Sequence, residues 1–151
     1  MNAIFEWAHV VGTEEVDELG RANNEVYLRW MNSAAVAHSA ALGWPLERYF
    51  RQGEGWVVRR HEIEYLRPAL PGAALIVRTW VRSFERASSW RCYAVWARLD
   101  NVLVARGRTL WAWIDFPTGR LRRIPAEVSS AFIVHMEDVF PDRAAGGIDA
   151  G

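Results

Sequence analysis

Apolar and polar residues alternate along several long segments of the chain, which is the pattern of β-strands that pack one face on a core. In residues 74–84 the side chains of Leu75, Val77 and Val81 share one face, and Trp80 lies between two arginines on the other. This second face needs a covering layer, supplied by the same chain or by another subunit. Together with a high content of Val, Ile, Trp, Tyr and Thr, the pattern predicts strands at residues 4–11, 56–67, 74–84, 88–99 and 103–116.

The breaks between the last four of these strands carry turn residues. Pro68 and Pro71-Gly72 follow the second strand, Asp100-Asn101 follow the fourth, and Pro117-Thr118-Gly119 follow the last. Such short connections favour antiparallel neighbours in one sheet.

Residues 24–42 follow a different period, with apolar or small side chains recurring every three or four positions. Asn23 is a good N-cap, Glu25 suits the positive first turn, Gly43 is suited to a C-cap and Pro45 prevents continuation. We therefore expect one helix of about five turns. Its alanine-rich face allows a close approach to a sheet.

The order of strand, long helix and four strands predicts an α+β hotdog fold, with an antiparallel sheet of five to six strands wrapped around one long central helix. Pro125 suits the start of a short further helix over residues 126–132. We expect a single domain over residues 1–136. The residues from 137 to 151 have little to bury, and we expect them to form a disordered tail.

Composition narrows the functional classes. The 18 basic residues are all arginine and balance 18 acidic residues, which argues against a nucleic-acid binder. No segment approaches the ~20 apolar residues of a membrane span, and residues 1–12 lack a basic region followed by an apolar core, so we expect a cytoplasmic location. Cys92 is the only cysteine, which excludes an intrachain disulfide, and no histidine spacing suggests a metal site. We predict no metal and no cofactor.

The strongest candidates for catalytic groups lie in the segment 16–30, which leads into the long helix and includes its start. A helix N-terminus offers unpaired N–H groups and a partial positive charge, which suit a carbonyl oxygen that becomes an oxyanion. Asp17 lies in the loop that leads into this helix, and the N–H of Asn24 belongs to its first turn. The carboxylate could act on a thioester as general base or as nucleophile. The alternative is a solvated turn in which Gly20 supplies a positive φ and the asparagines cap the helix.

This segment resembles the 4-hydroxybenzoyl-CoA thioesterase family of hotdog acyl-CoA thioesterases. The family pattern D-x-D-x-x-G-H-V-N-N-x-x-Y aligns with residues 15–27, which read EVDELGRANNEVY. The resemblance continues through residues 56–69 and 117–120 and covers roughly residues 4 to 130. It implies an acyl-CoA substrate, hydrolysed to a carboxylate and free coenzyme A. It also implies a homodimer or homotetramer with active sites at the subunit interface.

The resemblance assigns roles by position. Asp17 takes the place of the catalytic carboxylate, and Asn24 that of the backbone N–H donor to the thioester oxygen. The other motif positions that the substrate would meet are Gly20, Arg21, Asn23 and Tyr27. Two departures from the pattern matter: Glu15 replaces the first aspartate, and Arg21 replaces a histidine. Arg21 could pair with Glu18 or with Asp17, which would make Asp17 a weaker base.

Further candidates lie on the strands. In similar enzymes the substrate cleft passes near His61, although a satisfied histidine on a half-buried strand is the simpler interpretation. Arg82, Arg86 and Ser88 surround the turn between the third and fourth strands, where similar enzymes often meet the phosphates of coenzyme A. A solvated hairpin tip explains these three residues equally well.

Three hypotheses follow. The first is an acyl-CoA thioesterase. The second is a non-catalytic hotdog protein that binds acyl or aromatic ligands, with its site disabled by Arg21. The third, a hotdog hydratase or dehydratase, needs a catalytic histidine where Arg21 stands, and ranks last. Aromatic and aliphatic acyl groups both suit a tryptophan-rich pocket. The carrier is coenzyme A or an acyl-carrier protein, and the zero net charge gives no strong attraction to an acidic carrier.

Overall fold

The computed structural model describes residues 2–141 and contains one antiparallel sheet of five strands. Its spatial order is β1-β3-β4-β5-β2, with β1 and β2 at the edges. The predicted strands all form, with ends that differ by at most two residues. Their bounds are β1 Phe5–Val10, β2 Glu54–Tyr65, β3 Ala74–Phe84, β4 Ser88–Ala97 and β5 Val102–Asp115.

The long helix α1 spans Asn24–Ala41. Asn23 is its N-cap, and its Oδ1 accepts the N–H of Glu25 at 3.3 Å, which confirms the predicted start. The sequence did not predict the second, shorter helix, α2, Leu46–Gln52, whose N-cap is Pro45. Two shorter helical segments are the 3-10 turn η1, Thr13–Glu15, and α3, Ala126–Ser129.

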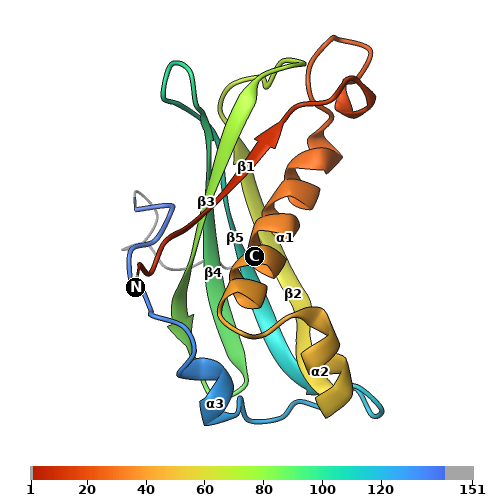
Figure 1. The fold of residues 1–151 in the computed structure, drawn as a ribbon, viewed down its shortest axis with the longest axis vertical. Coiled ribbons are helices and arrows are strands. Elements are labelled where there is room, and N and C mark those ends of the chain that lie inside the picture. The colour runs from red at the N-terminus through yellow and green to blue at the C-terminus, as the bar shows by residue number, and fades with distance from the viewer. Residues whose placement is uncertain (1, 142–151) are drawn as a thin grey trace.

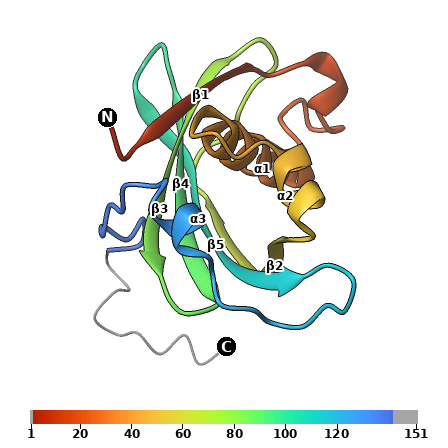
Figure 2. The same cartoon turned by 60° about the horizontal axis from the view of Figure 1, so that its bottom comes forward.

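The sheet curls around α1, which lies on its concave face (Figures 1 and 2). The loop between β1 and α1 lies at one end of the long axis, and α2 and α3 lie at the other. Small residues allow the close contact between helix and sheet. Ala34 and Ala35 are buried on α1, and a Cβ at Gly107 on β5 would approach Sδ of Met31 to 3.0 Å.

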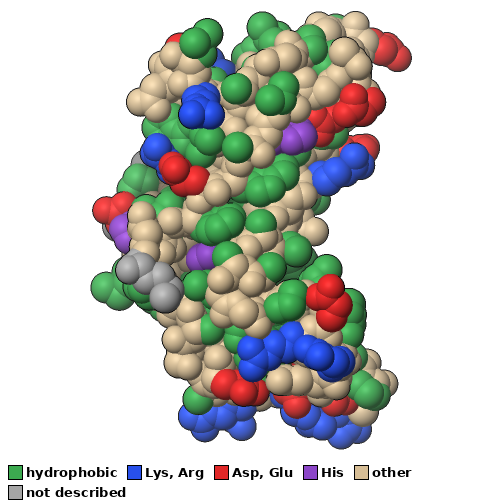
Figure 3. Space-filling view, viewed as in Figure 1, with side chains coloured by type: hydrophobic (Ala, Val, Ile, Leu, Met, Phe, Trp, Pro, Cys, Tyr) green, Lys and Arg blue, Asp and Glu red, His purple; other side chains and the backbone are tan. Residues whose placement is uncertain are grey.

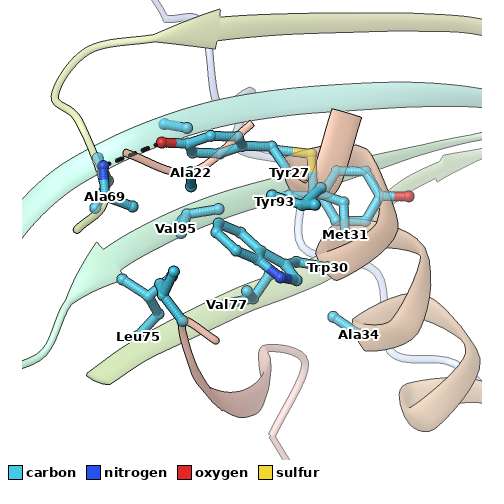
Figure 4. Packing of buried hydrophobic residues seen from close by; sticks show 14 of the residues in the cluster. Ala22, Tyr27, Trp30, Met31, Ala34, Ala69, Leu75, Val77, Tyr93 and Val95 are labelled. Atoms are coloured by element: carbon cyan, nitrogen blue, oxygen red, sulfur yellow. Dashed lines mark hydrogen bonds between the residues drawn. The ribbon is translucent and has the colours of Figure 1, made fainter. Parts of the chain in front are cut away.

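The main core lies between α1 and the strands near the N-terminal end of the helix (Figure 4). Tyr27 and Trp30 from α1 pack against Leu75, Val77 and Val95 from the sheet. The residues that the alternation of β3 placed inward are therefore inward, which confirms that part of the prediction.

The outer face of the sheet is covered by the C-terminal segment. Trp80 and Cys92 pack there with Val139 and Phe140, and the indole N–H of Trp80 donates to the carbonyl oxygen of Glu137 at 2.9 Å. Burial raises the pKa of the Cys92 thiol to about 11. Phe140, within the segment 137–151 for which the sequence predicts a disordered tail, is fully buried. The remainder of that tail, residues 142–151, lies outside the described residues.

An ion-pair cluster anchors this segment. Arg108 of β5 is buried, and its Nη1 donates to Asp138 at 2.8 Å while Nη2 donates to Glu62 at 3.0 Å. Two carboxylates therefore compensate this buried guanidinium.

Candidate functional site

The loop before α1 is a small hairpin closed by a bridge between Val16 and Ala22. The N–H of Asp17 donates to the carbonyl oxygen of Arg21 at 2.8 Å, and the N–H of Gly20 donates to that of Asp17 at 3.0 Å. Gly20 has a φ of 79°, a left-handed value that glycine adopts without strain. The predicted turn chemistry of this segment is therefore present, and it fixes the position of Asp17.

The carboxylate of Asp17 has one oxygen engaged by its own loop and one that is available. Oδ1 accepts the N–H of Leu19 at 2.9 Å and lies 3.5 Å from the backbone N of Arg21. Among the described residues, no donor reaches Oδ2. Asp17 and Asn23 line the same surface depression, of about 420 Å³, at the end of the molecule where acidic side chains gather (Figure 3).

The two asparagines divide their functions at the start of α1. Asn23 is engaged by the fold, since its side chain caps the helix and its N–H donates to the carbonyl oxygen of Glu15 at 2.8 Å. The N–H of Asn24 has no acceptor among the described residues, as expected for the first residue of a helix. Asp17 shares a surface depression with Asn23 and has a free carboxylate oxygen, and Asn24, the residue after Asn23, has a free N–H donor.

Glu15 holds this loop in place from the interior. Its Oε1 accepts from the N–H of Gly12 at 2.9 Å and from Nε2 of His9 at 2.8 Å, and its Oε2 accepts from the indole N–H of Trp30 at 2.8 Å. Burial alone would raise the pKa of the Glu15 carboxyl, but these hydrogen bonds outweigh it and lower the pKa. Glu15 is a charged clamp joining β1, η1 and α1. This role was not predicted from the sequence, where Glu15 was noted only as the replacement of the first aspartate of the motif.

The surroundings of Arg21 and Tyr27 differ from those expected of the substrate-contacting positions that the motif assigns to them. Arg21 is exposed, and within the described part of the chain it forms no ion pair with Asp17 or Glu18, the two partners that the sequence offered. Tyr27 is buried in the core, where its hydroxyl accepts the N–H of Ala69 at 3.2 Å (Figure 4). Tyr27 therefore supports the neighbouring loop from inside.

The remaining candidates lie apart from Asp17. His61 is on β2, where its Nδ1 lies 2.8 Å from Oγ1 of Thr109, and partial burial lowers its pKa. Arg82 lies 3.5 Å from Asp138 and is half-buried, whereas Arg86 is exposed. Ser88 lines a shallow pocket of about 420 Å³.

Two further arginines, Arg59 and Arg60, line the same shallow pocket as Ser88. A β-bulge in β2 lies between Val58 and Arg60, where bulges commonly redirect side chains. Neither Arg82 nor Arg86 lines this pocket, so Ser88 shares it with Arg59 and Arg60 from another strand. The sequence alone did not single out these two arginines.

A third, more enclosed cavity lies at the opposite end of α1, with a volume of about 260 Å³. It is enclosed by the C-terminal half of α1, by α2 and by the sheet, and aromatic rings from Trp44, Tyr49, Trp56 and Phe84 form much of its wall. One charged side chain lines it, that of Arg91, which sequence reasoning missed. The available signal was an arginine inside an apolar strand, in the run WRCYAV.

Two general features complete the description. Among residues 2–141 there is no group of three or more His, Cys, Asp or Glu side chains arranged to hold a metal ion. None of the helices in that range is long and apolar enough to cross a membrane.

The curled antiparallel sheet around α1 defines a hotdog-like thioesterase fold, and sequence comparison agrees with it. Residues 11–132 match the sequence profile of the thioesterase-like superfamily, and the chain belongs to this superfamily. No curated protein matches the sequence.

Solved structures share the fold at low sequence identity. A 1,4-dihydroxy-2-naphthoyl-CoA thioesterase from Synechocystis has a TM-score of 0.80 at 18% identity, over 85% of this chain and 94% of that one. A putative oleoyl thioesterase from Lactobacillus plantarum has a TM-score of 0.81 at 19% identity, over 90% of this chain and 54% of that one, so this chain spans about half its length. A Staphylococcus aureus protein solved in complex with CoA has a TM-score of 0.79 at 14% identity, over 85% and 80%.

Proposed function

We propose that this protein is an acyl-CoA thioesterase. The observation that carries the proposal is that the loop and the helix start around the cap residue Asn23 hold two groups without a partner among the described residues, a carboxylate oxygen of Asp17 and the N–H of Asn24. Membership of the thioesterase-like superfamily and the folds of proteins named as thioesterases support the same reaction class.

The proposed reaction uses both groups on one carbonyl. Oδ2 of Asp17 removes a proton from a water molecule whose oxygen attacks the thioester carbon. The carbonyl oxygen becomes an oxyanion and accepts a hydrogen bond from the N–H of Asn24, favoured by the helix dipole. The C–S bond then breaks, and the coenzyme A thiolate leaves and takes up a proton. Direct attack by Asp17, with hydrolysis of the resulting anhydride, uses the same two groups.

Coenzyme A binding is the second element of the proposal. The pocket lined by Ser88, Arg59 and Arg60 offers guanidinium groups and a hydroxyl, which suit phosphate oxygens. Arg86 is exposed two residues before Ser88 and could add a third cation. The S. aureus relative in complex with CoA is consistent with such a ligand.

We also propose that the protein acts as a homodimer or larger homo-oligomer. Asp17 and Asn23 line a depression that is open on the single chain, and β2 is a long edge strand that pairs only with β5 among the described strands. A second copy that covered both features would exclude water from the thioester and satisfy the strand edge. The soluble, cytoplasmic setting expected from the sequence remains part of this proposal.

The proposal is tested by measuring thiol release across a panel of aromatic, short-chain and long-chain acyl-CoA substrates. Turnover of at least one class, saturable in substrate, supports it. Binding of acyl-CoA without thiol release on prolonged incubation supports the second candidate, a non-catalytic ligand-binding protein. The aromatic cavity at the far end of α1 is the observation that favours this second candidate.

A further inference from the structure

Arg91 is a buried cation without a counter-ion. Only 6% of its surface is exposed, and it lies on β4 with Tyr93 and Val95 on the same face, the face toward α1. Burying an unpaired charge is costly, so buried guanidinium groups in proteins are normally compensated by carboxylates. Arg108, equally buried on β5, is compensated in this way by Glu62 and Asp138.

The neighbours of Arg91 are all neutral. Its Nη1 donates to Nδ1 of His38 at 2.9 Å and to Oγ1 of Thr79 at 3.0 Å. Burial, and then the charge of Arg91 itself, lower the pKa of His38 to about 4, so this ring is neutral at physiological pH. The ring of Phe132 lies 5.8 Å from the guanidinium carbon, and the hydroxyl of Tyr49 belongs to the same wall. No carboxylate among the described residues forms an ion pair with Arg91.

Several donors of Arg91 remain available to a ligand. A guanidinium carries five N–H groups, and the two hydrogen bonds above use only those on Nη1. Within the described structure, Nε and Nη2 have no acceptor, and the residue lines the cavity. The side chain of Trp111 also lines the cavity, with its indole N–H buried beside Tyr93. Arg91 therefore brings unsatisfied donors to one aromatic-walled space.

We infer that this cavity binds an organic anion whose aromatic or aliphatic body fills the apolar space and whose carboxylate pairs with Arg91. The volume of about 260 Å³ exceeds the roughly 150 Å³ that suffices for benzene, so a ring with a short chain fits. The exposed side chains of Leu46 and Phe50 from α2 line the same cavity and give it an apolar mouth. The site is separate from Asp17, because Ser39 lies about 22 Å from Asn24 along α1 at about 1.5 Å per residue.

The ligand could reach this site as a free acid or as the terminal carboxylate of a dicarboxylic acyl-CoA. Both sources present the same chemistry to Arg91. Neither requires hydrolysis, so the inference stands or falls independently of the proposed thioesterase activity.

The test compares 4-phenylbutyrate with its neutral isostere 4-phenylbutyramide, by titration calorimetry and by quenching of tryptophan fluorescence. A charge-assisted bidentate pair predicts that wild-type protein binds the acid at least about tenfold more tightly than the amide. Arg91→Met should bind the two compounds equally, whereas the exposed-site control Arg98→Met should keep the wild-type preference. Asp17→Asn should also keep it, which separates this site from the proposed catalytic one.

Equal binding of acid and amide by wild-type protein overturns the inference without any variant. So does the absence of saturable binding of benzoate, 4-phenylbutyrate and octanoate up to about 10 mM, an affinity within reach of ligands of this size. If Arg91→Met does not fold, Arg91→Lys serves instead, because lysine keeps the charge but lacks the planar, two-pronged donor group of arginine. This variant should bind the acid more weakly than wild type does, while still preferring the acid to the amide. A comparison of the octanedioic acid mono-CoA thioester with octanoyl-CoA distinguishes the two sources. If the protein prefers the dicarboxylic thioester and the preference depends on Arg91, the ligand is the acyl group of a dicarboxylic acyl-CoA. If that preference is absent while the preference for the free acid over its amide remains, the ligand is a free acid.

Discussion

His38 and Arg91 are joined by a hydrogen bond of 2.9 Å in which the guanidinium donates to Nδ1 of the imidazole. This geometry requires the neutral form of His38, because a protonated ring has no acceptor. The lowered pKa of about 4 has the same origin, burial followed by the charge of Arg91. A pH dependence of stability follows from this pair.

Stability should fall on acidification between pH 6.5 and 4. The unfolded chain protonates His38 near its ordinary pKa of 6.5, while the folded protein holds the ring neutral down to about pH 4. The contribution of neutral His38 to the free energy of unfolding is therefore fully present above pH 6.5. By pH 4 the free energy of unfolding should be about 3 kcal/mol lower because of this residue. Urea denaturation at a series of pH values measures the loss.

The matched variant is His38→Asn, whose Oδ1 can accept the same hydrogen bond without titrating. Its stability should change less with pH than that of wild type. Glu15, whose lowered pKa also reduces stability in acid, contributes equally to both proteins and cancels in the comparison. Identical slopes between pH 6.5 and 5 would show that His38 is not the responsible group.

The hydrogen bonds of the Glu15 clamp should contribute measurably to the free energy of unfolding. Glu15→Ala leaves the N–H groups of Gly12 and Trp30 without their acceptor, and we expect a loss of about 3 kcal/mol in the free energy of unfolding. The control is Glu14→Ala, one residue away on the exposed side of η1, with an expected change within about 0.5 kcal/mol. A loss of similar size in both variants would contradict the clamp.

The segment after residue 136 should contribute to stability through its buried aromatic ring. Phe140 is 0% exposed, and Phe140→Ala should cost about 4 kcal/mol because it opens a cavity against the sheet. Met136, 81% exposed, provides the comparison, since Met136→Ala should change stability by less than about 0.5 kcal/mol. Thermal unfolding of both variants decides whether this segment is part of the folded domain.

Patterns that depend on neighbouring residues in the sequence were predictable, and those that depend on distant contacts were not. Asn23 was assigned as the N-cap because a cap and its partner are two residues apart. The strands were found because their alternation extends over ten residues or more. Helix α2 was missed because seven residues carry too little periodicity, and Pro45 was interpreted only as a stop signal although it also precedes a helix.

The candidate site likewise has features that could be predicted from neighbouring residues in the sequence and others that depend on distant contacts. The loop that presents Asp17 could be predicted from its turn residues and from the motif around it. The function of Glu15 depends on contacts with His9 and Trp30, which approach it only in the folded chain. Arg91 could not be interpreted from sequence, because an inward arginine is unremarkable until its surroundings are known to lack a carboxylate.

Removal of a single backbone N–H tests the oxyanion site. Asn24→Pro deletes the proposed donor at a position where proline is compatible with the first turn of a helix, and Asn23 already has the extended ψ of 140° that precedes a proline. We expect kcat for thiol release to fall by about 10²–10³. Asn24→Ala keeps the N–H and should retain most activity. If the proline variant folds and turns over as fast as the alanine variant, this N–H is not the oxyanion donor.

The central claim is that Asp17 acts on the thioester, and the most direct test is thiol release by Asp17→Asn beside Glu18→Gln. Each variant removes one carboxylate charge from the same loop, and asparagine keeps the oxygen that accepts the N–H of Leu19. With an acyl-CoA that the wild-type enzyme hydrolyses, Asp17→Asn should lose at least about a hundredfold in kcat while Glu18→Gln stays within about threefold of wild type. Wild-type turnover by folded Asp17→Asn protein would contradict the account.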